Sequence, residues 1–168
     1  MPLIRPIPLA PIETEQLPEV EIKEVCNAES SEAGLVQLLY QQHHLEMIMR
    51  MKEHENLLGE MAWLYPHLKD VTYDAQPFRL KSGGLWTKPG MINIIEPIRH
   101  PDRPAPEIYW HFGETVFKPF FHKRFARTIY RLGWEPNQMY LIHDDITLRI
   151  VQGEADFNWL RPRIPTQP

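Results

Sequence analysis

The sequence predicts an α+β fold that consists of a proline-rich N-terminal arm, one long amphipathic helix, and a small, mostly antiparallel sheet with one packed helix. Two observations predict it. Seventeen of the 168 residues are proline, yet the 47 residues between Pro18 and Pro66 contain none. Because proline disfavours both helices and strand ladders, this gap favours one long regular element. After residue 70, short β-like runs alternate with turn residues.

Residues 1–29 are predicted to form an extended arm. Apolar residues alternate with proline in PLIRPIPLAPI, and acidic residues follow. The prolines interrupt any apolar run, so a signal peptide is not expected. An apolar extended arm needs a surface beneath it, either its own domain or a neighbouring subunit. Arg5, Pro8 and Pro11 are candidate partner-binding residues, because R-x-x-P-x-x-P is typical of polyproline-II ligands.

Residues 30–67 are predicted to form the long helix, because apolar residues recur along them every three or four positions. About 34 helical residues extend roughly 50 Å, whereas a compact domain of this size has a radius of gyration of about 15 Å. We therefore expect a projecting helix that oligomerises through Met47, Met51 and Leu58. The alternative is a helix that bends or breaks near Gly59 and is wrapped by the rest of the chain.

Residues 68–160 are predicted to form the small α+β domain, followed by a proline-rich tail at 161–168. A helix is expected over residues 119–133, with Pro119 in its first turn and Gly133 just after its end. Asp144-Asp145 is expected to turn a hairpin. The predicted strands are VTYD, PFRL, MINII, EIYWHF, QMYLIH and ITLRIV.

The predicted 119–133 helix carries Lys123, Arg124, Arg127 and Arg131 on one arc, with Phe120 beside them. Such an arc is typical of a solvated helix face. It is also a candidate docking face for an acidic partner segment or for nucleic acid.

The charge distribution also suggests docking of the arm. Residues 1–33 contain two basic and seven acidic residues, whereas residues 70–168 contain thirteen basic and eleven acidic residues. Opposite charges favour contact between arm and domain, within one subunit or between two. The overall net charge of −4 is unlike that of a strongly basic nucleic-acid-binding domain.

No cofactor, metal site or catalytic residue is predicted. His43 and His54 share a helix face but lie three turns apart, about 16 Å, too far to ligate one ion. His111 with Asp144 and Asp145 is the remaining candidate catalytic group, although Asp-Asp is common in turns for local reasons. The single Cys26 excludes an intrachain disulfide.

These features favour a non-enzymatic structural or assembly subunit. A virion or another large complex is the kind of assembly to which it would belong. It would form homo-oligomers or a larger protein assembly through its arm and long helix. It would be cytoplasmic or virion-associated and make no membrane contact, because no stretch approaches eighteen apolar residues. One alternative is a nucleic-acid-associated accessory protein that uses the 119–133 helix. A second is an enzyme with a site at His111, Asp144 and Asp145.

Overall fold

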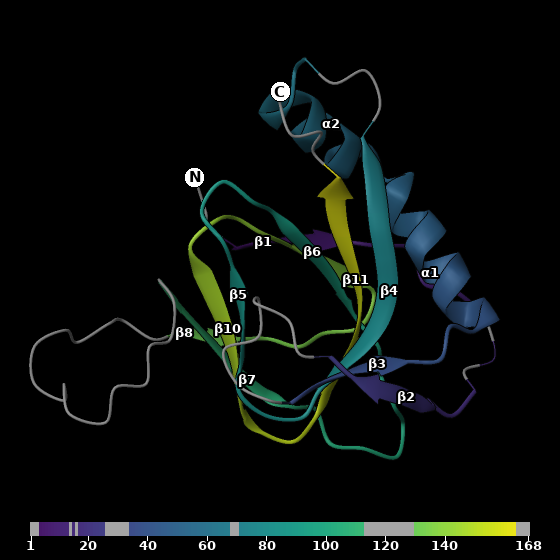
Figure 1. The fold of residues 1–168 in the computed structure, drawn as a ribbon. Coiled ribbons are helices and arrows are strands. Elements are labelled where there is room, and N and C mark those ends of the chain that lie inside the picture. Colours follow the sequence, from purple (N-terminus) through teal and green to yellow (C-terminus); the bar gives the residue numbers. More distant parts are fainter. Residues whose placement is uncertain are drawn as a thin grey trace, which may run out of the picture.

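The chain folds into three layers, as a computed structural model shows (Figure 1). A seven-stranded antiparallel sheet is the middle layer, with a four-stranded antiparallel sheet on one face and two short helices on the other. The predicted α+β fold with one long helix and a small sheet is therefore wrong. The structure describes residues 4–13, 15, 17–25, 34–67, 71–112 and 130–163.

Within these residues the two sheets contain eleven strands. The seven-stranded sheet has the order β1 (Ile4–Pro8), β9 (Gln138–Ile142), β6 (Asn93–Pro97), β11 (Ala155–Arg163), β4 (Thr72–Leu80), β3 (Leu35–Leu38) and β2 (Glu21–Glu24). The four-stranded sheet has the order β5 (Gly84–Thr87), β10 (Ile146–Gln152), β7 (Glu107–Phe112) and β8 (Tyr130–Leu132). The helices are α1 (Gln42–Lys52) and α2 (Glu55–Leu64).

Side chains of the central strands point alternately to the two faces of the large sheet and so contribute to two separate hydrophobic cores. On β6, Ile95 belongs to the core between the two sheets, whereas Ile94 belongs to the core beneath the helices. On β11, Trp159 and Leu160 divide in the same way. Successive side chains of a strand point to opposite faces, so a strand buried on both faces is apolar almost throughout. The run MINII has this pattern.

The predicted helix over residues 30–67 is replaced by β3, α1 and α2. The break between the helices falls at Glu53 and His54, where His54 Nδ1 accepts the backbone N–H of Asn56 at 3.3 Å and begins α2. Gly59, near which the alternative prediction placed a bend or break, lies inside α2. Both helices pack one side on the large sheet, and neither is long and apolar enough to cross a membrane; the same holds for every helix among the described residues.

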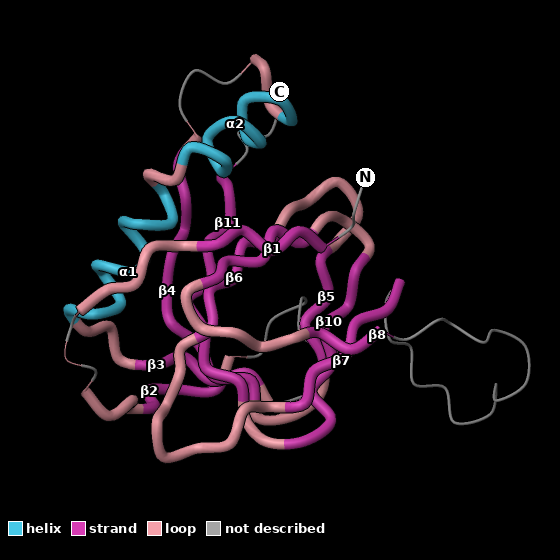
Figure 2. The backbone as a smooth tube through the Cα atoms, turned by 180° about the vertical axis from the view of Figure 1, so that it is seen from behind, coloured by secondary structure: helices cyan, strands magenta, loops and turns pink. Residues whose placement is uncertain are grey.

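The N-terminal arm lies on its own domain, which is one of the two placements expected for it. β1 pairs with β9, and Ile4, Ile7 and Leu9 are buried in the two cores. In Figure 2 the chain then runs from β1 past α1 towards β2. Further along, Glu21 accepts hydrogen bonds from Arg79 at 2.8 Å and Lys81 at 2.7 Å, so acidic residues of the arm dock on basic residues of the same chain.

Three smaller predictions are also corrected. The turn at Asp144-Asp145 connects β9 in the large sheet to β10 in the small one, so it does not form a hairpin. Residues 130–132 form β8, so the predicted helix over 119–133 is wrong at its end, while residues 119–129 lie outside the described residues. β11 continues to Arg163 and includes the start of the predicted tail.

The buried position of β1 makes the arm part of the folded domain, and a matched pair of substitutions tests this. Ile7 is 1% exposed and Ile22, on β2, is 53% exposed. Replacing Ile7 with Ala is expected to lower the free energy of unfolding by about 2–5 kcal/mol, because it leaves a cavity in the core. Replacing Ile22 with Ala should change it by no more than about 0.5 kcal/mol. Urea denaturation measures both, and equal effects would contradict the placement of β1.

Candidate functional site

An open groove with a volume of about 760 Å³ follows the outer side of α1. It lies between that helix, the start of α2 and the segment that follows β1. Its apolar lining includes Ala10, Ile12, Leu45 and Met49. Leu45 and Met49 lie one helical turn apart and are both more than 40% exposed. The groove therefore presents apolar side chains to solvent on a helix whose opposite side is already buried.

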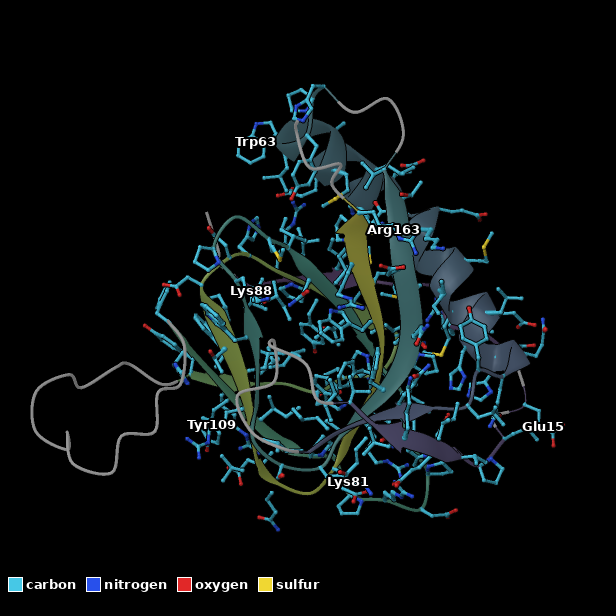
Figure 3. The ribbon with its side chains drawn as sticks, viewed as in Figure 1. Glu15, Trp63, Lys81, Lys88, Tyr109 and Arg163 are labelled. Carbon is cyan, nitrogen blue, oxygen red and sulfur yellow. The ribbon has the colours of Figure 1, made fainter. Side chains whose placement is uncertain are left out.

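The polar lining of the groove includes three acidic residues. Glu46, Glu53 and Glu55 line it. Glu55 lies in the first turn of α2, where the helix dipole stabilises a negative charge. Glu15 is exposed and is labelled near the N-terminal end of α1 in Figure 3, at the end of that helix away from α2. The groove thus combines apolar contact area with a negative potential.

Arg50 also lines this groove, and its guanidinium is hydrogen-bonded to groups beneath the helix. Its guanidinium donates to the carbonyl oxygen of Ala10 and to Oε1 of Glu96. Glu96 lies on the helix-facing side of β6 and is fully buried. Burial raises the pKa of Glu96 to about 7, against the opposing effect of Arg50. Arg50 therefore connects α1 to the segment at Ala10 and to β6, and its guanidinium is already engaged in these contacts.

A second cluster joins the N-terminal end of α1 to the segment before β2. The Nε2 atoms of His43 and His44 each lie 2.9 Å from Oε1 of Glu19. All three side chains are buried. Two imidazoles and a carboxylate are a ligand set suited to Zn²⁺, and the three ligand atoms lie within 4.8 Å of one another.

The hydrogen bonds of His44 argue against a metal at this cluster. Its Nδ1 accepts the backbone N–H of Gln41 at 3.0 Å, so in the neutral ring the proton is assigned to Nε2. Nε2 then donates to Glu19 and has no lone pair for an ion. Metal-bound histidines show the reverse pattern, in which the second ring nitrogen donates. The cluster fits a hydrogen-bonded clasp between the arm and α1 better than a metal site.

The surroundings of the clasp shift the pKa values of His43 and Glu19. Burial lowers the pKa of His43 from its usual value, and the hydrogen bond to Glu19 opposes this only in part. Burial also acts to raise the pKa of Glu19, but hydrogen bonds and charges from His44 and His43 outweigh it and the net shift is downward. The folded chain therefore favours neutral His43 and ionised Glu19.

A third polar group surrounds Asp156 on β11. Arg79 binds it through two hydrogen bonds of 2.6 and 2.7 Å, and His100 Nε2 lies 2.6 Å from Oδ2. Burial raises the pKa of Asp156, but the hydrogen bonds from Arg79 and His100 outweigh this and lower it. His100 and Asp156 line a small pocket of about 210 Å³, together with Trp134 and several prolines.

This pocket offers an oriented histidine but not the rest of a nucleophilic site. Among the described residues that line it, none carries a hydroxyl or a thiol. A carboxylate–histidine pair activates a nucleophile only when one lies within hydrogen-bond reach. The pocket therefore gives no support to acyl-transfer chemistry, and the ion pairs of Asp156 serve to join β4 and β11.

The predicted partner-binding residues fall into different environments. Met47 and Met51 are buried under α1 and cannot contact a partner, which corrects their assignment. Leu58 is exposed on α2. Arg5 donates to Glu60 Oε2 at 2.9 Å, and Pro8 and Pro11 are exposed. Arg131 is exposed on β8, whereas Lys123, Arg124 and Arg127 lie outside the described residues.

The predicted catalytic group has ordinary structural roles. Asp144 Oδ2 accepts the backbone N–H of Gly90 at 3.1 Å, and Asp145 adopts a positive φ of 57° in the turn before β10. His111 is buried on β7, with Nδ1 3.0 Å from the carbonyl oxygen of Phe112. The sequence did not point to Glu19, Glu96 or Asp156, because the partners of each are distant in the chain.

No known protein family matches this chain, and no curated protein has a similar sequence. The geometry of these sites is therefore the basis for any functional inference.

The clasp predicts that acid weakens the stabilising contribution of Glu19 and His43 to the fold. Because the pKa of His43 is lower in the folded chain than in the unfolded one, the unfolded chain binds more protons as the pH falls through about 6.5. The lowered pKa of Glu19 acts in the same direction at lower pH, as that carboxylate becomes protonated. Buried Glu96 acts in the opposite direction, because its raised pKa of about 7 makes the folded chain bind a proton in the same pH range. We therefore expect the contribution of the clasp to the free energy of unfolding to fall between pH 7.5 and pH 5.

Urea denaturation of the His43→Gln variant at several pH values measures the contribution of that histidine. The free energy of unfolding of the variant, taken relative to that of the wild type, should rise as the pH falls from 7.5 to 5, and this difference cancels the contribution of Glu96. His67→Gln is the matched control, because His67 is exposed. Parallel curves for the wild type and His43→Gln would contradict the role given to His43.

Proposed function

We propose that the chain is a non-enzymatic assembly subunit that binds a protein partner through the groove along α1. The observation that carries this proposal is the pair Leu45 and Met49, which are exposed in a groove bordered by glutamates. Apolar surface gathered in a hollow with a polar border is typical of protein-docking sites. The proposal extends to large complexes such as virions, in which many copies use the same surface.

The open edges of the large sheet are less suitable for assembly, which supports the groove. β1 carries Pro6 and Pro8, and proline cannot donate a ladder hydrogen bond. β2 is short and carries Glu21, Lys23 and Glu24 among its four exposed residues. Prolines, charges and short strands at an edge all oppose pairing with a second sheet. The side of α1 that carries the groove has no such protection.

The proposal changes the interface that the sequence suggested. Met47 and Met51 are taken up by the sheet beneath α1, so the partner would meet the neighbouring side of the helix instead. Deletion of the arm would not be a clean test of the interface, since Ile4, Ile7 and Leu9 belong to the cores. Substitutions confined to exposed residues of the groove leave the fold intact.

A double substitution in the groove tests the proposal. The L45E/M49E variant should be monomeric, with a mass of 19.9 kDa, at about 10 μM, where the wild type is oligomeric. Loss of a central apolar contact costs about 2 kcal/mol or more, so the dissociation constant should rise at least about 30-fold. Light scattering and sedimentation measure both quantities.

V151E is the matched control, because Val151 is also an exposed aliphatic residue but lies on β10 of the small sheet. It should assemble like the wild type. A wild type that stays monomeric at about 100 μM, or a groove variant that assembles normally, would refute the proposal.

Nucleic-acid binding is the second candidate function, and one row of the small sheet favours it. Arg149, Tyr109 and Arg131 are neighbours on three adjacent strands, on the face turned away from the core. Figure 3 labels Tyr109 on the opposite side of the molecule from α1. An aromatic ring between two guanidinium groups is an arrangement that binds single-stranded nucleic acid by stacking and charge.

Fluorescence anisotropy with a single-stranded oligonucleotide tests this second candidate. Binding should weaken as salt increases, and Arg131→Ala should reduce the slope of log affinity against log salt by about 1. Arg99→Ala is the control, because Arg99 is exposed in a loop of the other sheet. Binding that neither salt nor Arg131→Ala alters would exclude this function.

A further inference from the structure

The chemistry of the groove restricts what binds there. Leu45, Met49 and Ile12 offer apolar contact, and three glutamates line the same hollow. The guanidinium of Arg50 is already engaged by Glu96 and by the carbonyl oxygen of Ala10. A complementary occupant presents apolar side chains at helical spacing together with lysine or arginine.

The chain contains one segment of this composition between β7 and β8. Residues 113–129 lie outside the described residues, and their sequence is GETVFKPFFHKRFARTI. Phe121 and Phe125 are four residues apart, a spacing that puts them on one side of a helix, and Phe117 lies just before Pro119. Against one acidic residue, Glu114, the segment has four basic ones, Lys118, Lys123, Arg124 and Arg127.

The ends of this segment are fixed far from the groove of the same copy. Phe112 ends β7, Tyr130 begins β8, and Tyr130 pairs with Trp110 in the small sheet. A loop of seventeen residues with adjacent ends reaches at most about 29 Å. The groove lies on the outer side of α1, beyond the large sheet (Figure 1). In Figure 1, β8 and α1 lie on opposite sides of the molecule, so the segment would have to pass around both sheets to reach the groove of its own copy.

We propose that the groove of one copy binds residues 113–129 of a second copy. The phenylalanines contact Leu45 and Met49, and the basic side chains lie against Glu46, Glu53 and Glu55. The inference rests on the proposed assembly function and names its partner. Each copy then has one groove and one segment, so two copies can exchange segments in a closed two-fold dimer, or each copy can bind the next one head to tail. Head-to-tail contacts close into rings or continue as filaments.

Complementation between two defective variants tests the inference. L45E/M49E lacks the apolar contacts of the groove, and K123E/R124E/R127E lacks the positive charge of the segment. Each variant alone should be monomeric under conditions in which the wild type assembles. Mixed in equal amounts, they should form a heterodimer of about twice the monomer mass and nothing larger, because only one intact groove and one intact segment can pair.

Two further measurements complete the test. K23E/K88E/R99E changes the net charge by the same amount at other surface positions, and it should assemble like the wild type. A synthetic peptide of residues 113–129 should bind the wild type at least about 30-fold more tightly than L45E/M49E, and a scrambled peptide should not show this difference.

The outcomes separate the two proposals. If the wild type assembles through the groove but K123E/R124E/R127E assembles equally well, the groove has another occupant and only the inference fails. A mixture of the two variants that remains monomeric also overturns the inference. If the wild type is monomeric at about 100 μM, the assembly function fails and the inference fails with it.

Discussion

Both faces of the seven-stranded sheet must be covered, and the rest of the structure depends on this constraint. Its central strands place large apolar side chains on each side, as Ile94 and Ile95 do on β6. Exposing either face would leave a hydrophobic surface far larger than soluble proteins tolerate. The four-stranded sheet covers one face, whereas two short helices and the arm cover the other. Because α1 is a single layer, its far side stays open, and the groove is there.

Polar residues inside the helix-facing core fix how α1 lies on the sheet. Glu96 and Asn158 point towards the helices from adjacent strands, and they meet Arg50 and Met47. A buried charge without its partner is strongly unfavourable, so α1 has few alternative positions. Arg50 also holds the backbone at Ala10. The groove is therefore shaped by contacts that begin in the core, and a partner would meet a surface that is already organised.

The sequence predicts individual strands of this fold better than it predicts which segments pair or pack with one another. EIYWHF coincides with β7, and ITLRIV lies within β10, because strands buried on one face have a recognisable composition. The same periodicity joined β3, α1 and α2 into one helix, since it does not detect the pairing of Leu35 with Leu80. It also does not show which side of α1 faces the sheet. The clasp at Glu19 and the ion pair of Arg79 with Asp156 join residues 24 to 77 positions apart, so spacing could not reveal them.

β11 has a consequence for the way this chain acquires its structure. It is the last of the described strands in sequence, yet it occupies the middle of the large sheet between β6 and β4. During synthesis, β4 and β6 leave the ribosome with their inner edges unpaired and wait for residues 155–163. Contacts of such long sequence separation form slowly, and unpaired edges are prone to aggregation while they are exposed. The nascent chain is thus most vulnerable before residues 155–163 emerge, when a chaperone that binds exposed strands would protect it best.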